Sequence, residues 1–192
     1  RMGRYGPLVA MPRILETYRR LDLKQSFFIP GWCIETYPET IEIILKAGHE
    51  IGHHGYLHED PIDSPNQREC FERALLAHQK YCGGTPVGYR APLYNINQQT
   101  VELLIAKGFR YDSSMMADDI PYRIETNKGS LWEMPVHWGT DDWPPFAHYA
   151  EIGYMMPVSS PSNGLAGFWE EFDAAYEAGG FFMLIIHPFL TG

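Results

Sequence analysis

The sequence predicts an α/β fold built from parallel βαβ units, on two observations. A helical stretch, a glycine and a short apolar strand follow one another four times along the 192 residues, and one further helix–strand pair precedes them. Alternating helices and apolar strands of this length are typical of parallel βαβ units, which form either an open doubly wound sheet or a barrel. In addition, the reactive side chains fall at the carboxyl ends of the predicted strands, where both kinds of fold assemble their active sites.

The elements follow in chain order from hydrophobic periodicity and from helix-capping signals. Thr36 and Glu39 have the spacing of a capping box. Asn97 stands at an expected helix start, and Gly48 and Gly108 stand at expected helix ends. Helices are predicted at residues 11–25, 36–48, 64–84, 97–108 and 167–180, and strands at residues 26–31, 49–55, 85–92, 109–114 and 181–188.

Residues 115–163 break this rhythm. They contain one predicted strand, at residues 131–138, and a loop rich in Pro, Trp and Asp at residues 139–149. Long loops on an α/β scaffold commonly carry the binding site. No low-complexity tract or internal linker is present, so we predict a single catalytic domain over residues 1–192. The abrupt start and end of the sequence lead us to expect a truncated domain that lacks an N-terminal motif and a C-terminal helix.

Composition and charge disfavour several classes of function. No apolar run approaches the roughly 20 residues of a membrane helix. The net charge of −9 comes without a basic stripe, which disfavours a nucleic-acid partner. No G-x-G-x-x-G follows a strand and no P-loop is present, which disfavours nucleotide binding. Cys33, Cys70 and Cys82 form neither a metal-type pair nor an even disulfide set, so we expect a reducing, cytoplasmic location.

The strongest chemical signal is a cluster of four histidines within ten residues: His49, His53, His54 and His58. His54 and His58 are four positions apart, so on a helical turn both rings would point the same way and could bind one metal ion. His49 and His53 are expected either to be structural or to support the metal ligands without binding the metal themselves. The alternative is a histidine-rich surface loop, or core histidines that hydrogen-bond to backbone groups.

Other reactive groups stand at or near strand ends. His187 closes the predicted strand at residues 181–188, where an imidazole suits general acid chemistry, and the alternative is a capping histidine. Arg90 lies just before Pro92 and could hold a carboxylate in a bidentate pair, or it could be a surface arginine. The acidic candidates are Asp112, Asp118, Asp119, Asp141 and Asp142.

In this order, these motifs resemble those of the polysaccharide deacetylase family, also called carbohydrate esterase family four. The segments GHEIGHHGYLHE, SFFIPG and TDDWP are similar to a cytoplasmic branch that includes a Helicobacter-type peptidoglycan deacetylase, cyclic imide hydrolases and a metal-independent allantoinase. The resemblance spans nearly the whole chain. The family motifs H-[ST]-x-x-H, R-x-P, an Asp-containing segment and L-x-x-H match His54/His58, Arg90/Pro92, Asp112 in YDSS, and Leu184/His187.

The sequence departs from the family pattern at two points. Gly55 stands where the wider family has Ser or Thr, which fits the cytoplasmic branch and keeps the spacing of the histidine pair. The family's first motif, which supplies one Asp as general base and another as third metal ligand, is absent, since no Asp precedes Asp22. We expect both carboxylates upstream of Arg1.

The resemblance implies a deformed (β/α) barrel, incomplete at both ends, and metal-dependent hydrolysis of a non-peptide carbon–nitrogen bond in an N-acetylated sugar. His54 and His58 would bind a divalent metal, with zinc preferred. His187 would protonate the leaving nitrogen, Arg90 would orient the general base, and Asp112 would tune His187.

The substrate itself stays open at this stage. Tyr94, Trp138 and Trp143 are predicted to line its binding site, although aromatic residues here could equally belong to the core. The expected partner is a small-molecule or glycan amide, and the branch is often multimeric, which implies a homo-oligomer. The alternatives are a cyclic imide or ureide hydrolase, a metal-independent hydrolase that uses the same pocket, and an inactive binding protein on the same fold.

Overall fold

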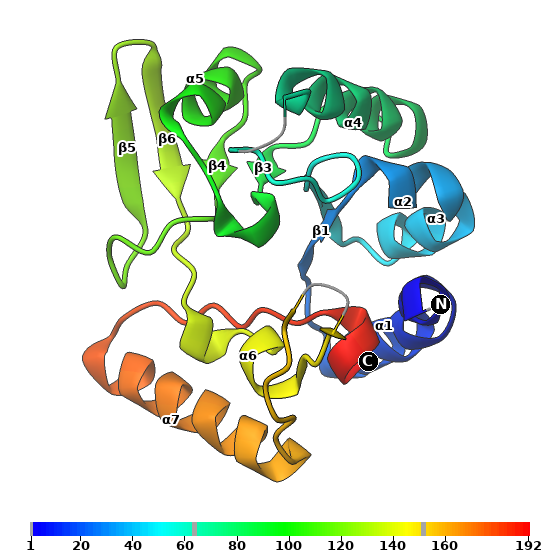
Figure 1. The fold of residues 1–192 in the computed structure, drawn as a ribbon, viewed down its shortest axis with the longest axis vertical. Helices are drawn as coiled ribbons and strands as arrows, with labels where there is room; N and C mark the ends of the chain where they lie inside the picture. Colours follow the sequence, from blue (N-terminus) through cyan, green and yellow to red (C-terminus); the bar gives the residue numbers. More distant parts are fainter. Residues whose placement is uncertain (1, 63–64, 151–152) are drawn as a thin grey trace. The chain divides into compact units, whose positions relative to one another are not determined.

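The computed structural model describes residues 2–62, 65–150 and 153–192 (Figure 1). In chain order the elements are η1 (Met2–Arg4), η2 (Gly6–Ala10), α1 (Met11–Leu21), β1 (Ser26–Ile29), α2 (Gly31–Thr36), α3 (Pro38–Lys46), β2 (Glu50–His53), α4 (Gln67–Tyr81), β3 (Gly88–Tyr89), η3 (Pro92–Tyr94), α5 (Gln98–Ala106), β4 (Tyr111–Asp112), β5 (Tyr122–Thr126), β6 (Gly129–Glu133), η4 (Trp138–Thr140), α6 (Trp143–Phe146), α7 (Pro161–Ala178) and α8 (Pro188–Thr191).

The strands form one six-stranded sheet in the order β1-β2-β3-β4-β6-β5. All neighbours are parallel except β5 and β6, which form an antiparallel hairpin. The α/β fold with parallel βαβ units is therefore confirmed. The register places one row of paired residues across the carboxyl ends of five strands: Ile29, His53, Tyr89, Asp112 and Glu133.

Helices that connect the strands pack against the sheet and bury its core. α3 and α4 contact β2, and α5 contacts β6. Burial of large apolar side chains between a helix and a sheet is the main favourable term that holds such a layer in place. The buried cluster between α4, α5 and the central strands comprises Phe71, Leu75, Tyr89, Ala91, Val101, Leu104, Phe109 and Leu131.

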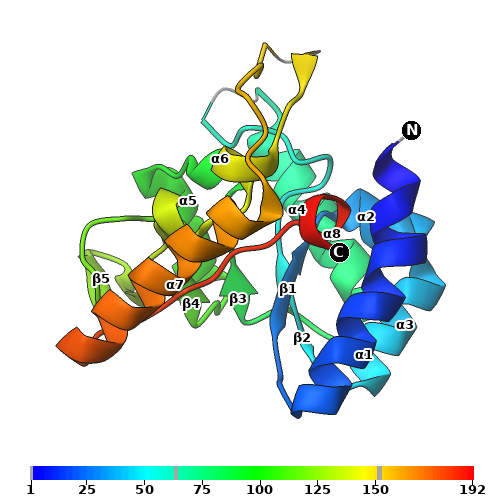
Figure 2. The same ribbon diagram turned by 90° about the horizontal axis from the view of Figure 1, so that it is seen from below.

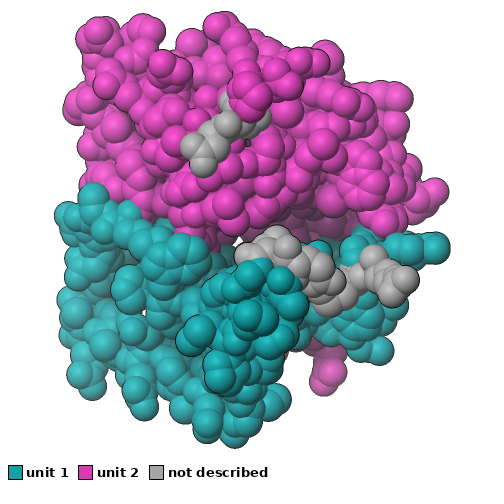
Figure 3. Space-filling model, in the orientation of Figure 1, with its two compact units in different colours: residues 1–14, 116–120, 135–192 teal, residues 15–115, 121–134 magenta. Residues whose placement is uncertain are grey.

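The chain forms two compact units, which Figure 3 colours separately. Unit 1 contains residues 1–14, 116–120 and 135–192, and unit 2 contains residues 15–115 and 121–134, with the whole sheet. Within unit 1, the extended segment after α7 runs back along that helix to α8 (Figure 2). Compact units can belong to one domain, so the single domain over residues 1–192 stays a prediction. No helix in the described ranges is long and apolar enough to cross a membrane.

Several helix ends confirm the capping signals. The side chain of Asn97 accepts a hydrogen bond from the backbone N–H of Thr100 at 2.9 Å, as an N-cap residue does. Gly48 and Gly108 follow helix ends with φ of 77° and 79°, a left-handed conformation that glycine adopts without strain. The predicted helix start at Ser64 lies outside the described residues.

The capping box at Thr36 and Glu39 was a wrong prediction. Thr36 ends the short helix α2, and its hydroxyl donates to the carbonyl of Trp32 at 2.7 Å. α3 then begins at Pro38, whose ring fixes φ and whose missing N–H costs nothing in the first turn. The sharp stop between α2 and α3 therefore comes from proline rather than from a hydroxyl cap.

The predicted strand at residues 181–188 was also wrong. Of this segment only Ile185 pairs, in an isolated bridge with Asp141, and the flanking residues run extended without a ladder. An apolar run shows that a segment is at least partly buried, but a strand also needs a neighbour with free backbone groups along its length. α7 begins at Pro161 rather than residue 167, and Ser160 caps it by accepting from the N–H of Asn163.

Candidate active site

The histidine pair lies in the loop that follows β2. The rings of His54 and His58 have their centroids 4.9 Å apart at an interplanar angle of 75°. This loop is not a helical turn, so that part of the prediction was wrong. Gly55 with φ of 68° and His58 with φ of 62° both have left-handed backbone conformations, and these two residues fold the chain back on itself. The tight return, rather than helical periodicity, brings the two imidazoles together.

The backbone carbonyl of Arg90 determines the tautomer of His54. Nδ1 of His54 lies 2.8 Å from that carbonyl oxygen. A carbonyl oxygen only accepts, so Nδ1 carries the hydrogen and donates it. Nε2 of the neutral ring then keeps its lone pair, which is the arrangement of most metal-bound histidines.

Buried hydrogen bonds hold the loop that carries this pair. His53 is fully buried: its Nε2 donates to the carbonyl of Phe71 at 3.1 Å, and its Nδ1 accepts from the N–H of Gly55 at 3.2 Å. Burial lowers the pKa of His53 to about 3, so its ring is neutral at neutral pH. The carboxylate of Glu59 accepts from the N–H groups of Tyr56 and Leu57. His53 is therefore a structural residue, as predicted.

Two imidazoles are a suitable part of a divalent metal site, because neutral imidazole is a good ligand for zinc and similar ions. Catalytic zinc sites usually have three protein ligands, of which His54 and His58 would supply two. Among the described residues, no group of three potential metal ligands includes this pair. The residues present therefore fit part of a metal site.

Arg90 is a buried arginine, so the alternative of a surface position was wrong. Its side chain is 9% exposed and its guanidinium carbon lies 4.4 Å above the ring of Phe28. Nε donates to the carbonyl of Ser113 at 2.8 Å, and Nη2 donates to the hydroxyl of the same serine at 2.6 Å. These contacts fix the plane of the guanidinium at the carboxyl end of β3.

Asp112 and Glu133 end the neighbouring strands β4 and β6, and both side chains are fully buried. Burial raises the pKa of Asp112 well above its usual range, and the adjacent carboxylate of Glu133 raises it further. Burial also raises the pKa of Glu133, while the hydrogen bond with Asp112 and the charge of Arg90 act in the opposite direction. The sequence analysis missed Glu133, and its only signal was an acidic residue within the apolar segment 131–136.

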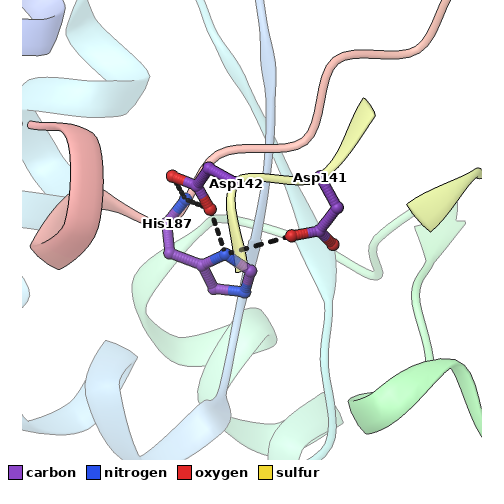
Figure 4. A group of neighbouring side chains, drawn as sticks. All are labelled: Asp141, Asp142 and His187. Atoms are coloured by element: carbon purple, nitrogen blue, oxygen red, sulfur yellow. Dashed lines mark hydrogen bonds and ion pairs between the residues drawn. The ribbon is translucent and has the colours of Figure 1, made fainter. Parts of the chain in front are cut away.

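In unit 1, His187 pairs with Asp142 (Figure 4). Nδ1 of His187 lies 2.7 Å from Oδ1 of Asp142, and the backbone N–H of His187 donates to the same carboxylate at 2.9 and 3.0 Å. The hydroxyl of Thr191 donates to Oδ2 at 2.8 Å. The Asp142 side chain is fully buried, whereas that of His187 is 30% exposed. A buried carboxylate of this kind holds the hydrogen of the imidazole on Nδ1 and fixes the ring orientation.

Asp141, Asp142 and His187 also form a group that could hold a metal ion, with candidate ligand atoms within 4.8 Å of one another. Protein donors already use these atoms, however. Both oxygens of Asp142 accept hydrogen bonds, and Oδ1 of Asp141 accepts from the N–H of Trp143 at 2.7 Å. Because Nδ1 of His187 is bonded to Asp142, the geometry fits a hydrogen-bonded acid–imidazole pair better than a metal site.

The predicted substrate-binding aromatics lie in different surroundings. The ring of Trp143 packs edge-on to that of His187 at 5.5 Å, so this side chain lies beside a candidate catalytic group. Trp138 is 46% exposed in η4. Tyr94 is half-buried in η3, two residues after Pro92, with φ of 58°.

The carboxylate that contacts His187 belongs to Asp142, and the predicted action of Asp112 on His187 was wrong in this respect. Asp142 stood among several acidic loop residues that spacing alone could not separate, and its signal was the TDDWP segment. The catalytic roles of Arg90, Asp112 and His187 stay predictions.

Comparisons with known proteins agree with this geometry. The model of the polysaccharide deacetylase family matches residues 5–111. The peptidoglycan deacetylase of Helicobacter pylori is 30% identical over 215 residues, which cover 97% of this chain and 73% of that protein.

Among solved structures, a Mycobacterium smegmatis protein assigned as a polysaccharide deacetylase is similar with a TM-score of 0.94 and 38% identity, over 99% of this chain and 67% of that one. PuuE allantoinase shares the fold with a TM-score of 0.83 at 23% identity, over 98% of this chain and 63% of that one. The chain therefore belongs to the polysaccharide deacetylase family, whose deacetylases are hydrolases of non-peptide carbon–nitrogen bonds.

Proposed function

We propose that this chain carries part of the active site of a metal-dependent deacetylase that acts on the N-acetyl groups of a polysaccharide. The observation that carries the proposal is the histidine pair: His54 and His58 lie side by side, and the Arg90 carbonyl holds the hydrogen of His54 on Nδ1, so that the lone pair of the neutral ring is on Nε2. The substrate class is supported by the similar Helicobacter pylori protein, a peptidoglycan deacetylase.

Each group has a separate part in the proposed mechanism. His54 and His58 would hold a divalent cation, which would supply a Lewis acid for the amide carbonyl and for water. His187, whose Nδ1 is hydrogen-bonded to Asp142, would act as the general acid and donate a proton from Nε2 to the leaving nitrogen. Trp143 packs edge-on to that imidazole and would help to orient it.

Zinc is the proposed cation, because histidine nitrogen is among its preferred ligands. A reducing, cytoplasmic location is proposed because Cys33, Cys70 and Cys82 are free thiols. Metal analysis of the purified protein and cell fractionation test these two proposals. Another bound metal would contradict the first, and secretion of the active protein would contradict the second.

The test is an acetate-release assay of the full-length protein on N-acetylglucosamine oligomers, with zinc added and after treatment with a chelator. We expect acetate release with zinc and its loss after chelation. Asn is the matched replacement for His58, because it tolerates the left-handed backbone and removes the imidazole. The His58→Asn variant should lose both activity and bound metal. Full activity after chelation, or in this variant, would refute the proposal.

A second candidate function is the opening of a cyclic imide or ureide. The observation that favours it is the fold likeness to PuuE allantoinase. The same protein preparation should therefore be assayed with small cyclic imides. Ring opening without acetate release from the glycan would replace the first proposal with the second.

A further inference from the structure

Two acidic side chains that the proposed mechanism does not use lie together inside unit 2. Asp112 and Glu133 are directly paired residues of the parallel strands β4 and β6. Both are fully buried, and an isolated buried carboxylate carries a high desolvation cost. Some interaction must therefore compensate for placing two of them side by side.

Each carboxyl group uses one oxygen for other partners. Oδ1 of Asp112 accepts from the hydroxyl of Ser114 at 2.7 Å. Oε1 of Glu133 accepts from the backbone N–H groups of Ser114 and Met115, both at 2.9 Å. The remaining oxygens, Oδ2 of Asp112 and Oε2 of Glu133, are buried with no other described donor. One proton between these two oxygens satisfies both of them and removes one of the two buried charges.

The pair is connected to Arg90 through the segment at residues 113–115, which follows β4. The hydroxyl of Ser114 accepts from the N–H of Ala91, next to Arg90. Ser113 accepts both hydrogen bonds from the guanidinium, and its own hydroxyl donates to the carbonyl of Met134 at 2.8 Å. The two acids thus hydrogen-bond to residues 114 and 115, and the neighbouring Ser113 accepts the hydrogen bonds that orient Arg90.

We propose that Asp112 and Glu133 share one proton and act together as positioning residues for Arg90, by fixing the segment at residues 113–115. In this arrangement Asp112 is the protonated partner and donates to Glu133. Its burial and the neighbouring carboxylate both favour the neutral acid, as the raised pKa of Asp112 indicates. This role replaces the predicted action of Asp112 on His187, and it rests on the proposed function only where activity is the readout.

A stability cycle tests the shared proton without any activity assay. In Asp112→Asn the amide can accept from Ser114 and donate to Glu133, so we expect Tm to fall by no more than about 3 °C. In Asp112→Ala the buried oxygen of Glu133 loses its donor, so Tm should fall by roughly 4–10 °C. In Asp112→Asn/Glu133→Gln two amide donors face each other, and the loss should exceed the sum of the single losses. Glu125→Ala, at an exposed position of β5, is the control, and no measurable change is expected because its ion pair with Arg123 lies at the surface.

An activity cycle tests the positioning role. Asp112→Ala should lower kcat by about ten- to a hundredfold with a smaller change in KM, and Asp112→Asn should restore most of that loss. In an Arg90→Ala background, the further Asp112→Ala change should cost less than about twofold, because the group it positions is already gone.

The outcomes separate the two proposals. Losses that multiply in the double variant would overturn the positioning role, since Asp112 would then act independently of Arg90. An Asn variant as unstable as the Ala variant, or an additive stability cycle, would overturn the shared proton. If the wild-type protein releases no acetate, the proposed function fails, and the stability cycle still decides whether the pair exists.

Discussion

Acid sensitivity of folding follows from two stacked histidines in the core. The rings of His53 and His78 lie 5.8 Å apart and nearly parallel, and both side chains are fully buried. Burial lowers the pKa of His53 to about 3 and that of His78 to about 4, against an unfolded value near 6.5. The unfolded chain therefore binds two protons that the folded chain excludes between about pH 6.5 and pH 4. Stability is complete above pH 6.5 and falls as the pH is lowered through this range.

The magnitude follows from the same values. Each excluded proton costs about 1.4 kcal/mol per pH unit, so lowering the pH from 7 to 5.5 should reduce the free energy of unfolding by about 2.5 kcal/mol for the two groups together. That is a large part of the 5–15 kcal/mol that stabilises a typical domain. Urea unfolding followed by circular dichroism, with a chelator present throughout, measures it.

His78→Leu is the matched variant. Neither ring nitrogen of His78 has a hydrogen-bond partner among the described residues, so leucine removes a titrating group without breaking a bond. Stability at pH 7.5 should be retained or rise slightly, and the loss between pH 7 and 5.5 should fall by about half. An unchanged pH dependence would show that His78 does not stay neutral in the folded protein, and the reasoning would be refuted.

Three further outcomes are expected. Asp142→Asn should lower kcat by about 10²–10⁴, because an amide no longer holds the Nδ1 hydrogen of His187 as a carboxylate does. Asp141→Asn is the control and should cost less, because Oδ1 of Asp141 lies 3.8 Å from the same Nδ1. Equal losses of the two variants in pre-steady-state acetate release would contradict this expectation. His58→Asn should remove bound zinc, measured by atomic absorption after gel filtration, and a retained equivalent would exclude it as a ligand. Leu104→Ala, in the core beneath the sheet, should lower the free energy of unfolding by about 2–5 kcal/mol in the same urea assay, and a loss below about 1 kcal/mol would mean that the site repacks.

The sequence predicted helix ends correctly where they depend on the conformation of a few neighbouring residues. Asn97 caps α5, and glycines with positive φ follow two other helices, because these roles depend only on a few neighbouring residues. His54 and Arg90 were placed correctly at strand ends, since apolar runs mark the strands and parallel strands end at one edge. The segment at residues 181–188 was not predicted correctly, because its pairing depends on a partner distant in the chain.

Pairings between distant residues explain what the sequence did not show. Asp142 contacts His187 across 45 positions, and Asp112 pairs with Glu133 only because β6 lies next to β4 in the sheet. β6 was predicted as part of the strand at residues 131–138, but its hairpin partner β5 was missed although Thr126 and Gly129 flank a two-residue turn, since the irregular segment around it hid the alternation of apolar and polar residues. Strand order, which periodicity does not encode, decides the contact between Asp112 and Glu133.

The two shortest strands have a consequence for interpreting related sequences. β3 and β4 pair over only two residues, so side chains at the end of β4 and just beyond it add the hydrogen bonds that a longer ladder would provide. Selection for a stable fold alone would then keep Asp112, Ser113 and Ser114 in a related protein that has lost its catalytic activity. Their presence in a homologue is a sign of an intact scaffold, and a working enzyme should be diagnosed from the imidazole pair instead.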